Sequence, residues 1–103
     1  MSRDLVAFLN ARYDEDEAVA RGGDDRSPDV TLRLDDDLRW VSITPARVLA
    51  EVAAKREVIR LAERAGDYHE TVLNGFAAAM EGALRLFALP FADHPDYQER
   101  WRP

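Results

Sequence analysis

The sequence predicts a mainly helical (α+β) fold: a three-helix bundle with a small β-hairpin between the first and second helices. Apolar residues recur at helical spacing over three long stretches, each of which ends at glycine or proline. A short run of alternating apolar residues, followed by three aspartates, lies between the first two stretches. Because 103 residues supply one hydrophobic core and not two, residues 1–103 are expected to form a single domain.

The first helix is expected from about residue 3 to about residue 21. Ser2 can cap it, and Asp4 then lies in the first turn, where the helix dipole favours an anion. Gly22 and Gly23 end it, since glycine tolerates the left-handed conformation of a helix terminus. Its predicted inward stripe comprises Leu5, Phe8, Leu9, Tyr13 and Val19.

The hairpin is expected between residues 30 and 43. Val30, Leu32 and Leu34 alternate with polar residues, which is the period of a strand with one buried face. Asp35–Asp37 interrupt this run and are assigned to the turn, and residues 38–43 are rich in types that favour strands. Because an isolated hairpin is marginally stable, its apolar face is expected to pack against the helices.

The second helix is expected to begin at Thr44 and Pro45, a capping hydroxyl followed by proline at the first helical position, and to end at Gly66. A capping box of Asp67 and Glu70 begins the third helix, which ends before the next proline. The short connection makes these two helices antiparallel neighbours. The predicted inward stripes are Val48, Leu49, Val52, Ile59 and Ala62 in the second helix, and Val72, Leu73, Phe76, Met80, Ala83, Leu84 and Phe87 in the third.

Three small residues, Gly75, Ala79 and Gly82, lie near one face of the third helix. Each glycine costs about 0.5–1 kcal/mol in a helix relative to alanine, so a close approach by a neighbouring element is expected there. That neighbour is the first helix, the second helix or the same helix of a second chain. A contact within the chain is favoured, because a small protein has few other ways to fit its elements around one core.

The net charge of −6 argues against several classes of partner. Residues 1–37 contain 11 acidic and 5 basic residues, whereas residues 38–103 contain 9 of each. Such an acidic chain lacks the basic face that favours binding to nucleic acid or anionic lipid, so neither a nucleic acid nor a membrane is expected as a partner. No run of 18 apolar residues is present and the first nine residues lack a signal-peptide pattern, so a cytoplasmic location is expected.

Arginines at positions 56, 60 and 64 form a basic stripe on the second helix. Glu57 and Glu63 flank this stripe, so ion pairs within the helix are expected. Contact with phosphate is the alternative interpretation of the same three arginines.

No catalytic residue, cofactor or metal is predicted, and enzymatic activity is left open with a non-enzymatic role favoured. The absence of cysteine excludes disulfides, a thiol nucleophile and a cysteine zinc site. Asp93, His94 and Asp96 are the densest group of possible metal ligands, but residues so close in sequence rarely converge on one ion. His94 is therefore interpreted as a turn residue that bonds to the backbone.

The C-terminal residues 91–103 are polar, yet they include Phe91, Tyr97 and Trp101. These aromatic residues either fold back and close the end of the bundle, or anchor a partner together with Arg102. Both interpretations explain why large apolar rings occur in an otherwise hydrophilic segment.

Three motifs resemble a known family. The first is DLVAFL at residues 4–9, which continues through the acidic residues 14–17. The second is PARVLAEV at residues 45–52, followed by AKR at 54–56. The third is LPFADHPDY at residues 89–97, with Trp101 after it. In this order they resemble the uncharacterised actinobacterial and phage family called domain of unknown function 6221. The resemblance implies no activity, cofactor or catalytic residue.

The chain departs from this family between the first helix and the Pro-Ala-Arg motif, where its segment is shorter. Many relatives also carry histidines just before that motif, whereas this chain has Val41–Thr44 there. A family metal site built on those histidines would therefore be missing from this chain.

The function favoured by the sequence is a protein-interaction module that is capable of self-association, with a protein partner or a second copy as its occupant. Phe91, Tyr97, Trp101 and Arg102 would contact the partner or lock the C-terminal segment that shapes the site. The alternative is a small ligand-binding domain or enzyme. Its anion site would lie near Trp40, Thr44 and Arg47, where the free N–H groups of a helix N-terminus favour an anion.

Overall fold

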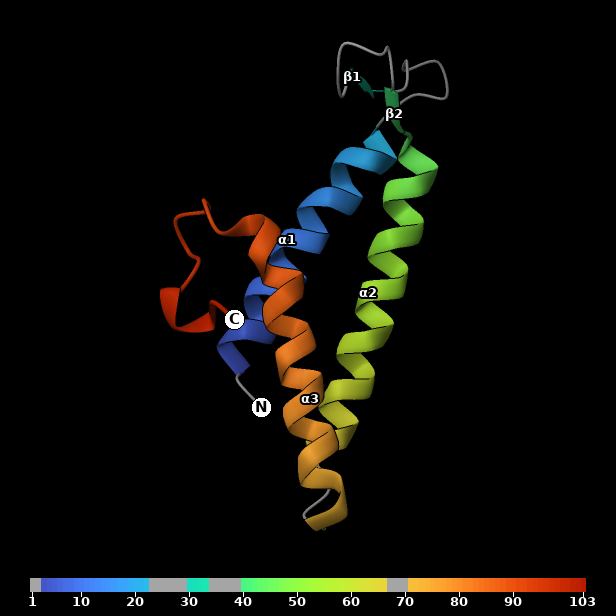
Figure 1. Ribbon diagram of the computed structural model, residues 1–103. Helices are drawn as coiled ribbons and strands as arrows, with labels where there is room; N and C mark the ends of the chain where they lie inside the picture. The colour runs from blue at the N-terminus through green and yellow to red at the C-terminus, as the bar shows by residue number, and fades with distance from the viewer. Residues whose placement is uncertain (1–2, 23–29, 34–39, 67–70) are drawn as a thin grey trace.

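The computed structural model describes residues 3–22, 30–33, 40–66 and 71–103 (Figure 1). Three helices dominate it: α1 (Arg3–Gly22), α2 (Pro45–Gly66) and α3 (Thr71–Ala88). In Figure 1, α2 runs antiparallel to α1, and α3 runs antiparallel to α2. The predicted three-helix bundle is confirmed. No helix in the described parts of the chain is long and apolar enough to cross a membrane.

The start of α2 follows the sequence prediction. The hydroxyl oxygen of Thr44 accepts a hydrogen bond of 3.0 Å from the backbone N–H of Arg47. The carbonyl oxygen of Thr44 accepts a second one, of 3.1 Å, from the N–H of Val48. The hydroxyl cap and the proline at the first position therefore fix where α2 begins. The other predicted caps, Ser2 and the Asp67–Glu70 box, lie outside the described residues.

Two short strands lie between α1 and α2. Strand β1 (Val30–Arg33) pairs antiparallel with β2 (Trp40–Ile43), with Val30 opposite Ile43. The turn predicted at Asp35–Asp37 lies outside the described residues. The hairpin as a complete unit, and its packing against the helices, therefore stay predictions.

The core lies where α1, α2 and α3 meet. Four of the five residues predicted for the inward stripe of α1 are buried, but Val19 is 78% exposed and that part of the prediction is wrong. Val19 extends the side of α1 that carries Phe8, and the C-terminal part of the chain covers that side only along the first half of the helix (Figure 1). The buried apolar core consists of Leu5, Phe8, Leu9, Tyr13, Val52, Ile59, Ala62, Leu84, Ala88 and Trp101.

Helix α3 buries only one of its two apolar faces. Leu84 and Ala88 are fully buried, whereas Phe76, predicted to face inward, is 51% exposed. Gly75 and Gly82 are exposed as well, and a Cβ atom at either position would meet no atom of the described residues within 4 Å. The favoured close contact within the chain at these glycines is therefore wrong, because α1 and α2 pack against the opposite face of the helix.

Replacement of Gly82 by alanine is expected to raise the free energy of unfolding by about 0.5–1 kcal/mol, since it removes the glycine penalty and meets open space. The reverse change on the same exposed side, Ala78→Gly, should lower it by a similar amount. Urea unfolding of both variants at low protein concentration measures these changes. Destabilisation by Gly82→Ala would mean that part of the chain closes on this position.

Candidate functional site

The C-terminal segment, residues 89–103, folds back along the first half of α1 (Figure 1). It contains two short 3-10 helices, η1 (Leu89–Phe91) and η2 (Glu99–Trp101). The ring of Trp101 is 3% exposed and lies 5.1 Å from that of Phe8 and 5.7 Å from that of Tyr97. Phe91 meets Phe8 edge-on at 6.3 Å and Tyr13 at 6.1 Å. The structure thus brings three of the four predicted partner-binding residues together in one aromatic cluster.

His94 is the turn residue that the sequence predicts. Its backbone N–H donates to the Phe91 carbonyl at 2.9 Å, and its carbonyl accepts from the Tyr97 N–H at 3.0 Å. Its ring nitrogen Nδ1 accepts from the backbone N–H of Asp96 at 3.0 Å, and the ring packs edge-on against Phe8 at 5.6 Å. Within the described part of the chain, no three His, Cys, Asp or Glu side chains converge on a possible metal position.

Arg12 is a buried charge that the sequence analysis missed. It is 7% exposed, and its guanidinium lies 5.2 Å from the centre of the Phe8 ring. Its Nη2 donates to Glu15 at 3.1 Å, and its Nη1 contacts Nε2 of His94. Its burial could have been predicted from its position, because residue 12 falls on the inward stripe of the first helix with residues 8 and 9. Arg12 therefore lies between α1 and the His94 turn, with its guanidinium against the Phe8 ring.

Arg102, the fourth predicted partner-binding residue, is exposed. Its guanidinium donates two hydrogen bonds of 2.9 Å to the carboxylate of Glu99 and lies 5.8 Å from the centre of the Tyr97 ring. The hydrogen bonds from Arg102 lower the pKa of Glu99. Since both partners are exposed, the pair orders the surface of the C-terminal segment and adds little to stability.

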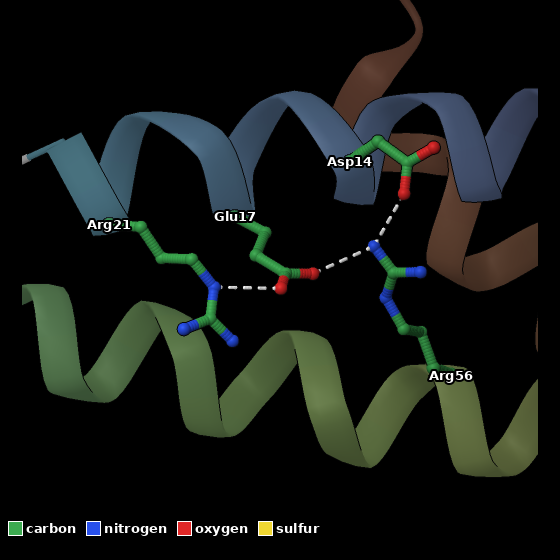
Figure 2. A network of polar contacts seen from close by, with 4 residues as sticks. All are labelled: Asp14, Glu17, Arg21 and Arg56. Carbon is green, nitrogen blue, oxygen red and sulfur yellow. Dashed lines mark hydrogen bonds and ion pairs between the residues drawn. The ribbon is translucent and has the colours of Figure 1, made fainter.

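A cross-helix polar network joins α1 to α2 (Figure 2). Arg56 Nη2 lies 2.7 Å from Oδ1 of Asp14 and 3.1 Å from Oε2 of Glu17. The other oxygen of Glu17 accepts from Nε of Arg21 at 2.8 Å. A shallow cleft of about 240 Å³ opens beside these groups, and Arg60 also lines it.

The network corrects one prediction about the basic stripe. Arg60 pairs with Glu57 on the same helix at 2.5 Å, as expected, but Arg56 crosses to the acidic run of α1. The spacing of the arginines could not show this contact, because pairing between helices depends on how they pack. Because arginines hold its carboxylates, the network connects α1 to α2.

The alternative anion site is only partly described. Thr44 and Arg47 are brought together, but by the cap hydrogen bond between the Thr44 hydroxyl and the Arg47 N–H. The side chain of Arg47 extends to Glu51, with Nε 3.2 Å from Oε1. The side chain of Trp40 lies outside the described part of the structure. One of the N–H groups that an anion would use is therefore already bonded.

Tyr13 is a buried phenol in the middle of α1. It is 1% exposed, and its hydroxyl has no hydrogen-bond partner within the described residues. Burial, with a smaller effect of the Asp16 carboxylate, raises the pKa of Tyr13 from 10.0 to about 12. Because the charged form is disfavoured only in the folded state, ionisation of Tyr13 opposes folding.

Tyr13 is expected to make stability fall at alkaline pH. Its contribution is fully present below pH 10 and is lost as the pH rises from 10 towards 12, a difference of about 2–3 kcal/mol. Tyr13→Phe should remove this loss and, by deleting an unpartnered hydroxyl, match or exceed wild-type stability near neutral pH. Chemical unfolding of both proteins between pH 7 and 11 tests this. Parallel pH profiles would contradict it.

The outward face of α3 is an exposed apolar surface. We use this term for Gly75, Phe76, Ala78, Ala79, Gly82 and Leu86 of α3 together with Leu89, the first residue of η1, all of which are exposed and none of which is charged. Phe76, Leu86 and Leu89 are 51%, 56% and 38% exposed. The sequence signal that could have found this face was the position of its residues around the helix. At helical spacing, Leu86 and Leu89 fall on the side of Gly75, Ala79 and Gly82, whereas Leu84 falls on the opposite side.

Comparison with known proteins identifies a family. The family model described as "Family of unknown function (DUF6221)" matches residues 2–103, nearly the whole chain. This match confirms the resemblance drawn from the three motifs. No curated protein and no solved structure matches the chain. The chain therefore belongs to the DUF6221 family, whose function is unknown.

Proposed function

We propose that this protein is a protein-interaction module whose contact surface is the outward face of α3. The observation that carries the proposal is the exposure of Phe76, Leu86 and Leu89 on a helix whose opposite face is already in the core. A helix that is apolar all round is normally buried on both sides. A contiguous apolar patch left in water marks a site where another molecule binds.

The composition of the face favours a protein over other partners. None of its defining residues is charged and Arg85 is the one basic residue of α3 beside it, so it offers little to the phosphates of a nucleic acid, and the chain has a net charge of −6. The face follows a single helix, and helix packing against an apolar groove or another helix is a common mode of protein recognition. The exposed leucine of α2, Leu61 at 44%, has Glu57 and Arg64 as helical neighbours and serves as a comparison.

The residues predicted to bind a partner support this surface indirectly. Trp101, Tyr97 and Phe91 pack on Phe8 and on each other, so they lock the C-terminal segment against α1. The segment begins directly at the end of α3. In this proposal the aromatic cluster holds the end of α3 in place, and α3 itself makes the contact.

Site-specific photo-crosslinking in the cells that make the protein tests the proposal. A photoreactive residue at Leu86 should capture a protein, either another copy or a different chain, and the same residue at Leu61 should not. Both positions are exposed, so neither substitution disturbs the core. The proposal fails if the two positions give equal yields or if Leu86 captures no protein.

A further inference from the structure

The outward face of α3 is not uniform along its length. Its first half carries small residues, Gly75, Ala78 and Ala79, and its last part carries the large side chains of Leu86 and Leu89. Gly82 lies between the two halves. Phe76 lies at the edge of the face, about 100° around the helix from Gly75. The face is therefore a shallow hollow at one end and a ridge at the other.

We infer that the occupant of this face is a second copy of the same chain, packed antiparallel with the two helices crossing at Gly82. This inference rests on the function proposed above. An antiparallel pair centred on Gly82 sets Leu89 of each copy opposite Gly75 of the other, and Leu86 opposite Ala78. Each ridge then fills the hollow of the other copy, as packed helices require when large and small residues alternate across an interface.

A parallel pair would not fit in this way. It would set Leu86 against Leu86 and Leu89 against Leu89, so the ridges would hold the helices apart and leave a gap at Gly75. The antiparallel arrangement also sets the two helix dipoles in opposition, which is the more favourable orientation. The spacing of residues 75, 79, 82, 86 and 89 alternates between four and three, the repeat that keeps one stripe facing a partner helix.

The available area fits a reversible dimer. The face runs from Gly75 to Leu89 and is therefore about 21 Å long. Two such faces packed together bury less than about 1,000 Å² in total, the size of a weak, transient interface. Two chains that each carry a net charge of −6 repel at long range, whereas the residues that define the face are uncharged and Arg85 borders it. The dimer is therefore expected to strengthen as salt rises, because salt screens this repulsion.

Single cysteines test the arrangement, because the natural chain has none. Gly82→Cys should form a disulfide between copies under mild oxidation, since the two positions meet at the crossing point. Its yield should exceed that of the exposed control Leu61→Cys on α2 by at least tenfold. Gly75→Cys alone should not link, but a mixture of Gly75→Cys and Leu89→Cys should. A Cβ at position 75 or 82 meets open space, so these variants should fold, and their melting temperatures will show it.

The outcomes separate this inference from the proposed function. Equal linking of Gly82→Cys and Leu61→Cys overturns the second copy as occupant. If the photoreactive residue at Leu86 then captures a different protein, the proposed function stands without self-association. If it captures nothing, both fall. Self-linking at all of positions 75, 82 and 89 would show a parallel pair and overturn the antiparallel arrangement.

Discussion

Replacement of Trp101 by alanine is expected to lower the free energy of unfolding by about 3–5 kcal/mol, as large aromatic truncations in cores do. The ring is 3% exposed and packs against both Phe8 and Tyr97. Its loss leaves a cavity and releases the end of the C-terminal segment from α1. Urea unfolding followed by circular dichroism measures the change, and the first half of α1 should lose protection from hydrogen exchange.

The matched control for this prediction is Arg102→Ala, one residue further along. Arg102 and its partner Glu99 are exposed, so this change should cost less than about 0.5 kcal/mol. If Trp101→Ala also costs less than about 0.5 kcal/mol, the C-terminal segment is not part of the core. The aromatic residues would then be free to contact a partner directly.

Leu84→Ala and Leu86→Ala should have very different effects, although the two leucines are two residues apart on α3. Leu84 is fully buried between the helices, and its truncation should cost about 3 kcal/mol or more. Leu86 is 56% exposed, and its truncation should cost less than about 1 kcal/mol in the monomer. Unfolding at low protein concentration compares them. If both truncations lower the free energy of unfolding by a similar amount, the assignment of Leu84 to a buried face and of Leu86 to an exposed face is wrong.

The helices were predictable because local signals decide where helices begin and end. Thr44 with Pro45 fixed the start of α2, and the periodic residues Leu5, Phe8 and Leu9 identified the inward side of α1. The turn at His94 was predictable for the same reason, since its hydrogen bonds join residues close in sequence. Such contacts depend on neighbours along the chain and not on how the helices are arranged.

The errors arose where packing between distant segments decides the outcome. Val19 and Phe76 have apolar side chains at plausible helical positions, but no described element covers them, and this coverage cannot be read from spacing. Arg56 pairs with Asp14, 42 residues away, and not with its helical neighbours. Both cases depend on which helix faces which.

The candidate site was half predictable. The small residues Gly75, Ala79 and Gly82 identified the correct face of α3, but the sequence alone placed it inside the bundle. Two apolar stripes share this helix, and only the fold shows that α1 and α2 occupy the one with Leu84. The second stripe was therefore taken for part of the core, when its residues are exposed.

Sedimentation velocity over a wide concentration range tests most directly whether the outward face of α3 binds a second copy of the chain. The wild-type protein is expected to shift from monomer towards dimer as its concentration rises. Leu86→Glu, which places a charge within the contact, should remain monomeric, while Leu61→Glu on α2 should dimerise like the wild type. A wild-type protein that remains monomeric throughout, or equal behaviour of the two glutamate variants, would contradict this account.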